Sequence, residues 1–97
     1  MKHFDWDDEK NELLKHERGI TFEEVVFHIE NGDVLDVIEH PNAAKYRSQK
    51  IYILDIDGYA YLVPFVEEED HFFLKTVIPS RKATRDLIVE EDTDDET

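Results

Sequence analysis

Residues 20–32 carry a complete set of signals for one helix, and this segment limits the possible folds of the chain more than any other. Thr21 and Glu24 have the Thr-x-x-Glu spacing of a capping box, in which side chains satisfy the free N–H groups at a helix start. Asn31-Gly32 follows as a stop signal. Between them the apolar residues fall at helical spacing, at Phe22, Val25, Val26 and Ile29. We therefore predict a helix here with one buried apolar face.

From Asp33 onward the apolar residues change to the spacing of strands. Asp57-Gly58 separates two strand segments and suits a type I′ hairpin turn. Pro64 has no N–H to donate to a neighbouring strand, which indicates an edge position or a bulge near it. We expect strands at 3–6, 34–39, 49–56, 59–66 and 71–78, and further helices at 8–18 and 81–89. The order β-α-α-β-β-β-β-α predicts an α+β fold, a small antiparallel sheet with two N-terminal helices and one C-terminal helix.

The 97 residues are enough for one modest core, since 40% are hydrophobic, and we expect a single domain over residues 1–89. Residues 90–97 contain six acidic residues, so we expect a disordered acidic tail there. This tail is either a solubilising extension or a segment that folds back over a basic surface.

Several classes of protein are excluded by composition. The chain contains no cysteine, which excludes disulfides, thiolate zinc sites and thiol nucleophiles. Its histidines show no metal-ligand spacing. The longest uncharged apolar run, Tyr59–Val66, is far shorter than a membrane span. We therefore expect a cytoplasmic domain that binds no metal, no cofactor and no membrane.

The net charge of -14 argues against a nucleic-acid partner, because binding phosphates requires basic side chains. The basic residues are nevertheless clustered. Segments 45–50 and 75–85 hold seven of the 11 Lys and Arg residues and contain no acidic residue. Such clusters are able to form a cationic patch on a protein that is acidic as a whole.

Two parts of the sequence resemble the BrnT family of bacterial type II toxins. The first is the opening of the chain, at Phe4-Asp5-Trp6-Asp7, Lys10-Asn11, Lys15-His16 and Ile20-Thr21-Phe22-Glu23-Glu24. The second is Ile78-Pro79-Ser80-Arg81-Lys82-Ala83-Thr84, which is similar to the closing signature Ile-Ser-Ala-Arg-x-Ala of that family. The resemblance implies a RelE-like fold and a ribonuclease that arrests growth. It also implies neutralisation by a cognate DNA-binding antitoxin, of the ribbon-helix-helix type.

Cleavage of RNA without a metal needs Arg or Lys to stabilise charge at phosphorus, and a group that exchanges protons. Arg81 is the first candidate for holding the phosphate, because it matches the signature arginine of the family and follows Ser80, the expected N-cap of the last helix. Basic residues in a first helical turn oppose the helix dipole, and an anionic ligand would relieve that cost. The alternative is that Arg81 forms an ion pair with Glu23 or Asp86.

The other candidates lie in the two basic segments and in the loop before them. Arg47 is expected to act with Arg81 in catalysis, assisted by Lys50, and Tyr46 to stack on a base. His40 is the candidate proton carrier, since histidine serves as a general acid or base. The alternatives are a solvated loop at 45–50 and an exposed structural histidine before the proline. The remaining predicted RNA-binding residues are Lys75, Lys82 and Arg85.

Two functions are therefore open. One is the toxin, with the ribonuclease activity and antitoxin that the resemblance implies. The other is a non-catalytic protein-interaction module of the same fold. They differ in whether Arg47, Lys50 and Arg81 converge with a proton-exchanging group in one cleft. For the toxin we expect the antitoxin to cover the basic patch, so that charge reversal at Arg81 and Lys82 weakens the complex.

Overall fold

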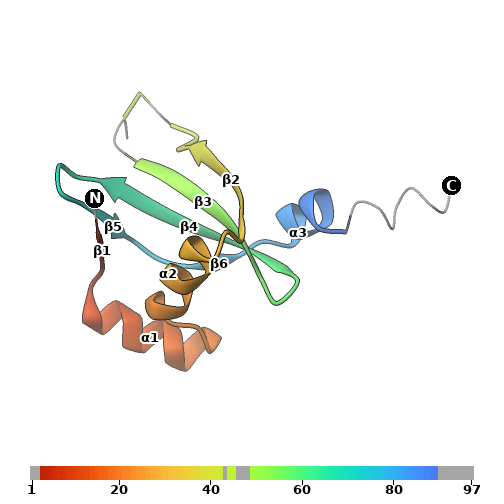
Figure 1. Ribbon diagram of the computed structural model, residues 1–97, viewed down its shortest axis with the longest axis horizontal. Coiled ribbons are helices and arrows are strands. Elements are labelled where there is room, and N and C mark those ends of the chain that lie inside the picture. The colour runs from red at the N-terminus through yellow and green to blue at the C-terminus, as the bar shows by residue number, and fades with distance from the viewer. Residues whose placement is uncertain (1–2, 43, 46–48, 90–97) are drawn as a thin grey trace, which may run out of the picture.

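The computed structural model describes residues 3–42, 44–45 and 49–89 (Figure 1). The α+β class is confirmed, and the predicted bounds of most elements agree closely with the observed ones. The predictions for Tyr46, Arg47 and residues 90–97 lie outside the described residues. None of the described helices is long and apolar enough to cross a membrane. In chain order the elements are β1 (His3–Asp5), α1 (Asp8–Arg18), α2 (Phe22–Glu30), β2 (Val34–Glu39), β3 (Gln49–Ile56), β4 (Tyr59–Glu67), β5 (His71–Leu74), β6 (Ile78–Pro79) and α3 (Arg81–Leu87).

The strands form one sheet in the order β1-β5-β4-β3-β2, and β6 also pairs with β4. Neighbouring strands are antiparallel except β1, which runs parallel to β5. The sheet is thus mixed, where the sequence predicts an antiparallel one. Two helices separate β1 from the next strand of the chain, and a connection of that length does not fix strand direction as a tight turn does.

The predicted last strand, 71–78, is divided into β5 and β6. β5 pairs with β4 at 65–67 and β6 pairs with β4 at 61–62, so Pro64 lies opposite the division. The carbonyl of Pro64 accepts a hydrogen bond from the N–H of Lys75 at 2.8 Å. Since N–H and C=O of one residue in an antiparallel strand point to the same side, the donor that Pro64 lacks would face this interruption. Pro64 is therefore accommodated in a central strand and not at the sheet edge.

A type I′ turn joins β3 to β4, as predicted. Asp57 has a φ of 55° and Gly58 a φ of 84°, and both positive values are what this turn requires. The N–H of Gly58 donates to Oδ1 of Asp55 at 2.9 Å. The two strands stay in register from Ile56 opposite Tyr59 to Gln49 opposite Val66.

Helices pack on both faces of the sheet (Figure 1). Ile53 and Leu54 are neighbours in β3 whose side chains point to opposite faces, and they are only 7% and 0% exposed. Leu54 belongs to the main core on the side of α1 and α2, which we call the α2 face. Ile53 faces α3 on the other side, the α3 face. The main core consists of Leu14, Ile20, Phe22, Val25, Leu54, Ile56, Val63, Phe65, Leu74 and Val77.

Backbone groups of Ala60 in β4 fix α3 to the sheet. The N–H of Ala60 donates to Oγ1 of Thr84 at 2.8 Å, and its carbonyl accepts from the N–H of Ser80 at 2.9 Å. The hydroxyl of Thr84 donates in turn to the carbonyl of Ser80 at 2.7 Å. Ser80 is the N-cap of α3, because its hydroxyl accepts from the N–H of Ala83 at 3.1 Å. Ser80, Ala83 and Thr84 of the closing motif thus hold the helix in place.

We expect Thr84→Val to lower the free energy of unfolding by about 1–3 kcal/mol, because it leaves the fully buried Ala60 without a partner for its N–H. Thr84→Ser keeps the hydroxyl and is the matched control, with a much smaller loss. Urea denaturation of both variants measures the difference. Equal loss in the two variants would show that the hydroxyl does not hold α3.

Candidate functional site

Arg81 stands at the start of α3 and makes no ion pair with any described residue. Both carboxylates that the sequence offers as partners bind other groups. Asp86 lies 3.3 Å from Nζ of Lys82 and 3.7 Å from Nε of Arg85, and Glu23 accepts from the amide of Asn11 at 2.9 Å. The guanidinium of Arg81 therefore remains available to an anion.

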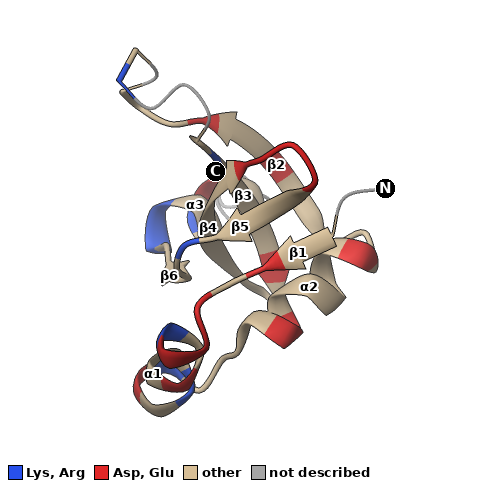
Figure 2. Cartoon of the chain, turned by 90° about the vertical axis from the view of Figure 1, so that its left-hand side faces the viewer, with Lys and Arg blue, Asp and Glu red and all other residues tan. Residues whose placement is uncertain are grey.

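Basic residues lie on both sides of β6 (Figure 2). Three of them belong to α3, and Lys75 lies in the segment between β5 and β6. Large acidic segments of the same view lie elsewhere, in the turn between β4 and β5 and in the segment from β1 into α1. Four basic residues thus lie together around α3 and β6, with the carboxylate of Asp86 among them. We call the group of Lys75, Arg81, Lys82 and Arg85 the basic surface.

Lys50 does not belong to this basic surface. It lies opposite Phe65 of the main core, which places it on the α2 face, and its Nζ is 3.8 Å from a carboxylate oxygen of Glu67. Since α3 packs on the other face, the structure does not bring Lys50 and Arg81 together.

His40 lies in the loop after β2. Its ring Nδ1 accepts a hydrogen bond from the backbone N–H of Asn42 at 3.0 Å, and the backbone N–H of His40 donates to the carbonyl of Gln49 at 3.3 Å. Two residues before it, Ile38 lines a groove of about 320 Å³ beneath α3. His40 therefore follows a strand, β2, whose residue Ile38 lines the groove on the α3 face. Its Nδ1 is already used in a hydrogen bond within the loop.

That groove is mostly apolar. Its walls include Ile53 and Leu62 from the sheet and Leu87 from α3. Ile38 and Leu87 are 37% and 40% exposed. The basic surface and an open apolar groove thus share α3.

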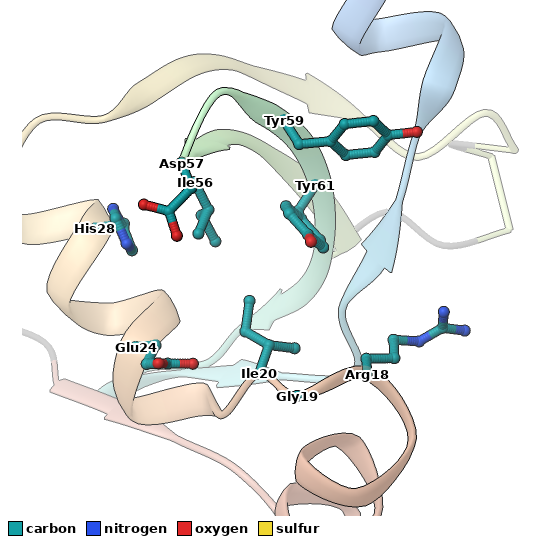
Figure 3. A pocket seen from close by; sticks show the side chains of 9 residues that line it. All are labelled: Arg18, Gly19, Ile20, Glu24, His28, Ile56, Asp57, Tyr59 and Tyr61. Atoms are coloured by element: carbon teal, nitrogen blue, oxygen red, sulfur yellow. The ribbon is translucent and has the colours of Figure 1, made fainter.

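A second cavity, of about 240 Å³, lies on the α2 face at the end of the sheet near the β3–β4 turn (Figure 3). Three segments far apart in the sequence form it. They are the end of α1 with the following loop, the side of α2, and the β3–β4 hairpin. Its lining residues are Arg18, Gly19, Ile20, Glu24, His28, Ile56, Asp57, Tyr59 and Tyr61.

The end of α2 builds a histidine–aspartate pair beside this cavity. The N–H of Asp33 donates to the carbonyl of His28 at 3.0 Å, and the N–H of Gly32 donates to the carbonyl of Ile29 at 3.3 Å. These two bonds form a Schellman motif, which a positive φ of 86° at Gly32 permits. The same turn brings Oδ2 of Asp33 to 2.8 Å from Nδ1 of His28. An ionised carboxylate only accepts, so Nδ1 carries the hydrogen and Nε2 is left for another partner.

Sequence reasoning missed this pair, although the signal was present. The stop signal Asn31-Gly32 fixes the geometry of the helix end, and that geometry places the residue after the glycine beside the residue five positions before it. An acid at the first position and a histidine at the second are therefore predicted to meet. The sequence pattern assigns Asp57 only to the hairpin turn.

The hydrogen bond from His28, with a further one from Asn31, lowers the pKa of Asp33 below that of an ordinary aspartate. The folded state therefore favours the ionised carboxylate. The stability that this provides is fully present above the ordinary pKa of an aspartate and is lost as the pH falls through the lowered pKa.

In the variant His28→Ala we expect the pKa of Asp33 to rise towards its ordinary value. Carboxyl carbon NMR shifts measured against pH test this. Asp70, whose pKa a hydrogen bond from His71 lowers, is the internal control that should not move. An unchanged titration of Asp33 would contradict the pairing.

Comparison with known proteins gives no match: no family model, no curated protein and no solved structure is similar to this chain. Function must therefore be argued from the basic surface, the groove and the cavity. The likeness to the BrnT family stays an expectation from the sequence.

Proposed function

We propose that this chain is the toxin of a bacterial type II toxin–antitoxin system and cleaves RNA without a metal. The observation that supports this best is Arg81, which stands on a helix fixed by Ser80 and Thr84 and has no carboxylate partner among the described residues. A docked helix that carries an unpaired guanidinium suits the binding of a phosphate group.

The other residues of the basic surface extend the contact with the phosphate backbone. Lys75 makes no ion pair with a described residue, while Lys82 and Arg85 share Asp86. These are exposed ion pairs of little net strength, and a phosphate can replace the carboxylate as partner. In this proposal Arg81 stabilises the charge that develops at phosphorus, and His40 is the proton carrier.

The test uses the purified full-length chain, an RNA of mixed sequence and a chelator of divalent metals. We expect cleavage by the native chain, and a loss of about 10²–10³-fold in Arg81→Ala, as when one donor to a transition-state oxyanion is removed. Lys10→Ala is the matched control, because it removes one positive charge from α1 on the other face of the sheet. Equal cleavage by the two variants, or no cleavage by the native chain, would contradict the proposal.

The groove beneath α3 favours a second candidate function, a non-catalytic protein-interaction module. Its apolar walls and the exposed Ile38 and Leu87 suit a segment of another protein. In the toxin proposal the same surface receives the antitoxin, a DNA-binding protein of the ribbon-helix-helix type. Charge reversal at Arg81 and Lys82 is expected to weaken that complex, and full-strength binding by the reversed variant would place the antitoxin elsewhere.

A further inference from the structure

Two side chains of opposite charge line the cavity of Figure 3 without pairing. Asp57 comes from the β3–β4 turn and Arg18 from the end of α1, and the figure shows them on opposite sides of the cavity. Neither side chain makes a hydrogen bond or ion pair with a described residue. A carboxylate and a guanidinium that stand apart in this way suit the two ends of one ligand, an end with N–H donors and an anionic end.

One side of the cavity is aromatic. Tyr59 and Tyr61 both come from β4, and their ring centroids lie 5.8 Å apart with the planes at 67°. A planar ligand is able to stack on one ring and meet the edge of the other. The volume of about 240 Å³ is below the roughly 300–1,000 Å³ of drug-sized ligand pockets, so the cavity suits a single ring system with a sugar.

His28 adds a third polar group to the cavity. Nδ1 of His28 donates to Oδ2 of Asp33 over 2.8 Å, and no described residue forms a hydrogen bond with Nε2 of His28. In the neutral ring Nε2 is a hydrogen-bond acceptor, so it suits a ligand hydroxyl or N–H. Glu24 also lines the cavity, but one of its carboxylate oxygens is already bound to the N–H of Thr21 at 3.0 Å.

We propose that this cavity binds one nucleotide. Its base packs against Tyr59 and Tyr61 and directs its N–H donors to Asp57 and to Nε2 of His28, which lie at the same end of the cavity, while Arg18 binds its phosphate. Bases with an exocyclic amino group present more donors to a carboxylate than uracil does, and guanine suits this cavity best. The inference goes beyond the proposed function, because binding a nucleotide here requires no cleavage. The nucleotide is either free or one unit of an RNA strand.

The first experiment is an NMR titration of the full-length chain with guanosine monophosphate, uridine monophosphate and guanosine. We expect guanosine monophosphate to shift the resonances of Tyr59, Tyr61 and His28, and to bind about tenfold more tightly than uridine monophosphate. Asp57→Asn should lower its affinity about tenfold, since asparagine keeps the turn at positive φ but removes the charge. Asp36→Asn, the same change on β2, is the matched control that should leave the affinity unchanged.

A second variant tests the anionic end of the ligand. Arg18 is exposed, so Arg18→Gln should fold normally. In this variant guanosine monophosphate should bind no more tightly than guanosine. If Arg18→Gln still binds guanosine monophosphate more tightly than guanosine, or if Asp57→Asn binds guanosine monophosphate as tightly as the native chain does, the assigned contacts are wrong and the proposal fails.

A short oligoribonucleotide as a further probe distinguishes the two sources of the nucleotide. If the free nucleotide shifts the resonances of the cavity residues as much as the oligonucleotide does, the result supports a free ligand. Shifts with the oligonucleotide alone, abolished in Asp57→Asn, support one unit of an RNA strand. No shift of the cavity residues with any probe overturns the inference. These outcomes are independent of RNA cleavage, because Arg81 and α3 do not line the cavity.

Discussion

Replacement of Phe22 by alanine is expected to lower the free energy of unfolding by about 3–5 kcal/mol, a large part of the roughly 5–15 kcal/mol that stabilises a domain. Phe22 is the first residue of α2, is 0% exposed and belongs to the main core. Its ring stacks on that of Trp6, with centroids 5.7 Å apart and planes at 24°. The truncation therefore opens a cavity where the segment after β1, α2 and the sheet meet.

Phe27→Ala is the matched control for this prediction. Phe27 lies on the same helix but is 61% exposed, so its truncation should change the free energy of unfolding by no more than about 0.5 kcal/mol. Urea denaturation of both variants gives the comparison directly. Similar losses in the two would mean that α2 does not bury the face that carries Phe22.

Asn11→Ala is expected to lower the free energy of unfolding by about 1–3 kcal/mol, because a buried N–H loses its partner. Asn11 is the one buried polar residue among the described residues. Its Oδ1 accepts from the N–H of Phe22 at 2.7 Å, and its Nδ2 donates to Oε1 of Glu23 at 2.9 Å. One side chain of α1 thereby fixes the start of α2.

A second readout comes from the same variant. The bond from Asn11 is the largest cause that lowers the pKa of Glu23, so this pKa should rise towards its ordinary value in Asn11→Ala. Glu12→Ala, the next residue of the helix and an exposed one, is the control for both measurements. A stable Asn11→Ala chain with an unchanged titration of Glu23 would contradict the described contacts.

Local signals explain why so much of the fold follows from the sequence. The capping box of α2 is present with both of its bonds, at 3.2 Å and 3.0 Å, and the turn at Asp57-Gly58 has the predicted φ values. Each of these depends on residues that are neighbours in the chain. The direction of β1 and the division into β5 and β6 depend instead on pairing between distant segments, which no local pattern specifies.

In the candidate site, too, some features follow from local sequence and others depend on contacts between distant segments. The helix that carries Arg81 follows from Ser80 and the residues after it, so its position could be predicted. The separation of Lys50 from Arg81 depends on which face each strand residue takes, and this appears only when the register is known. The cavity was not predictable, because α1, α2 and the β3–β4 hairpin each supply only part of its lining.

The net charge of the whole chain does not describe the charge of the basic surface. A net charge of -14 describes the whole sequence, whereas the basic surface contains four cations around α3 and β6. Phosphate binding responds to the local potential, which decays within about a Debye length, roughly 8–10 Å in physiological salt. The overall charge therefore does not exclude RNA as a ligand of this surface.

The measurement that tests the central claim most directly is tightly induced expression in a bacterial host, with growth and total RNA integrity followed over time. The account predicts growth arrest and RNA decay with the native chain, and neither with Arg81→Ala at equal soluble expression. Normal growth and intact RNA with the native chain, at confirmed soluble expression, would contradict the toxin and favour the protein-interaction module.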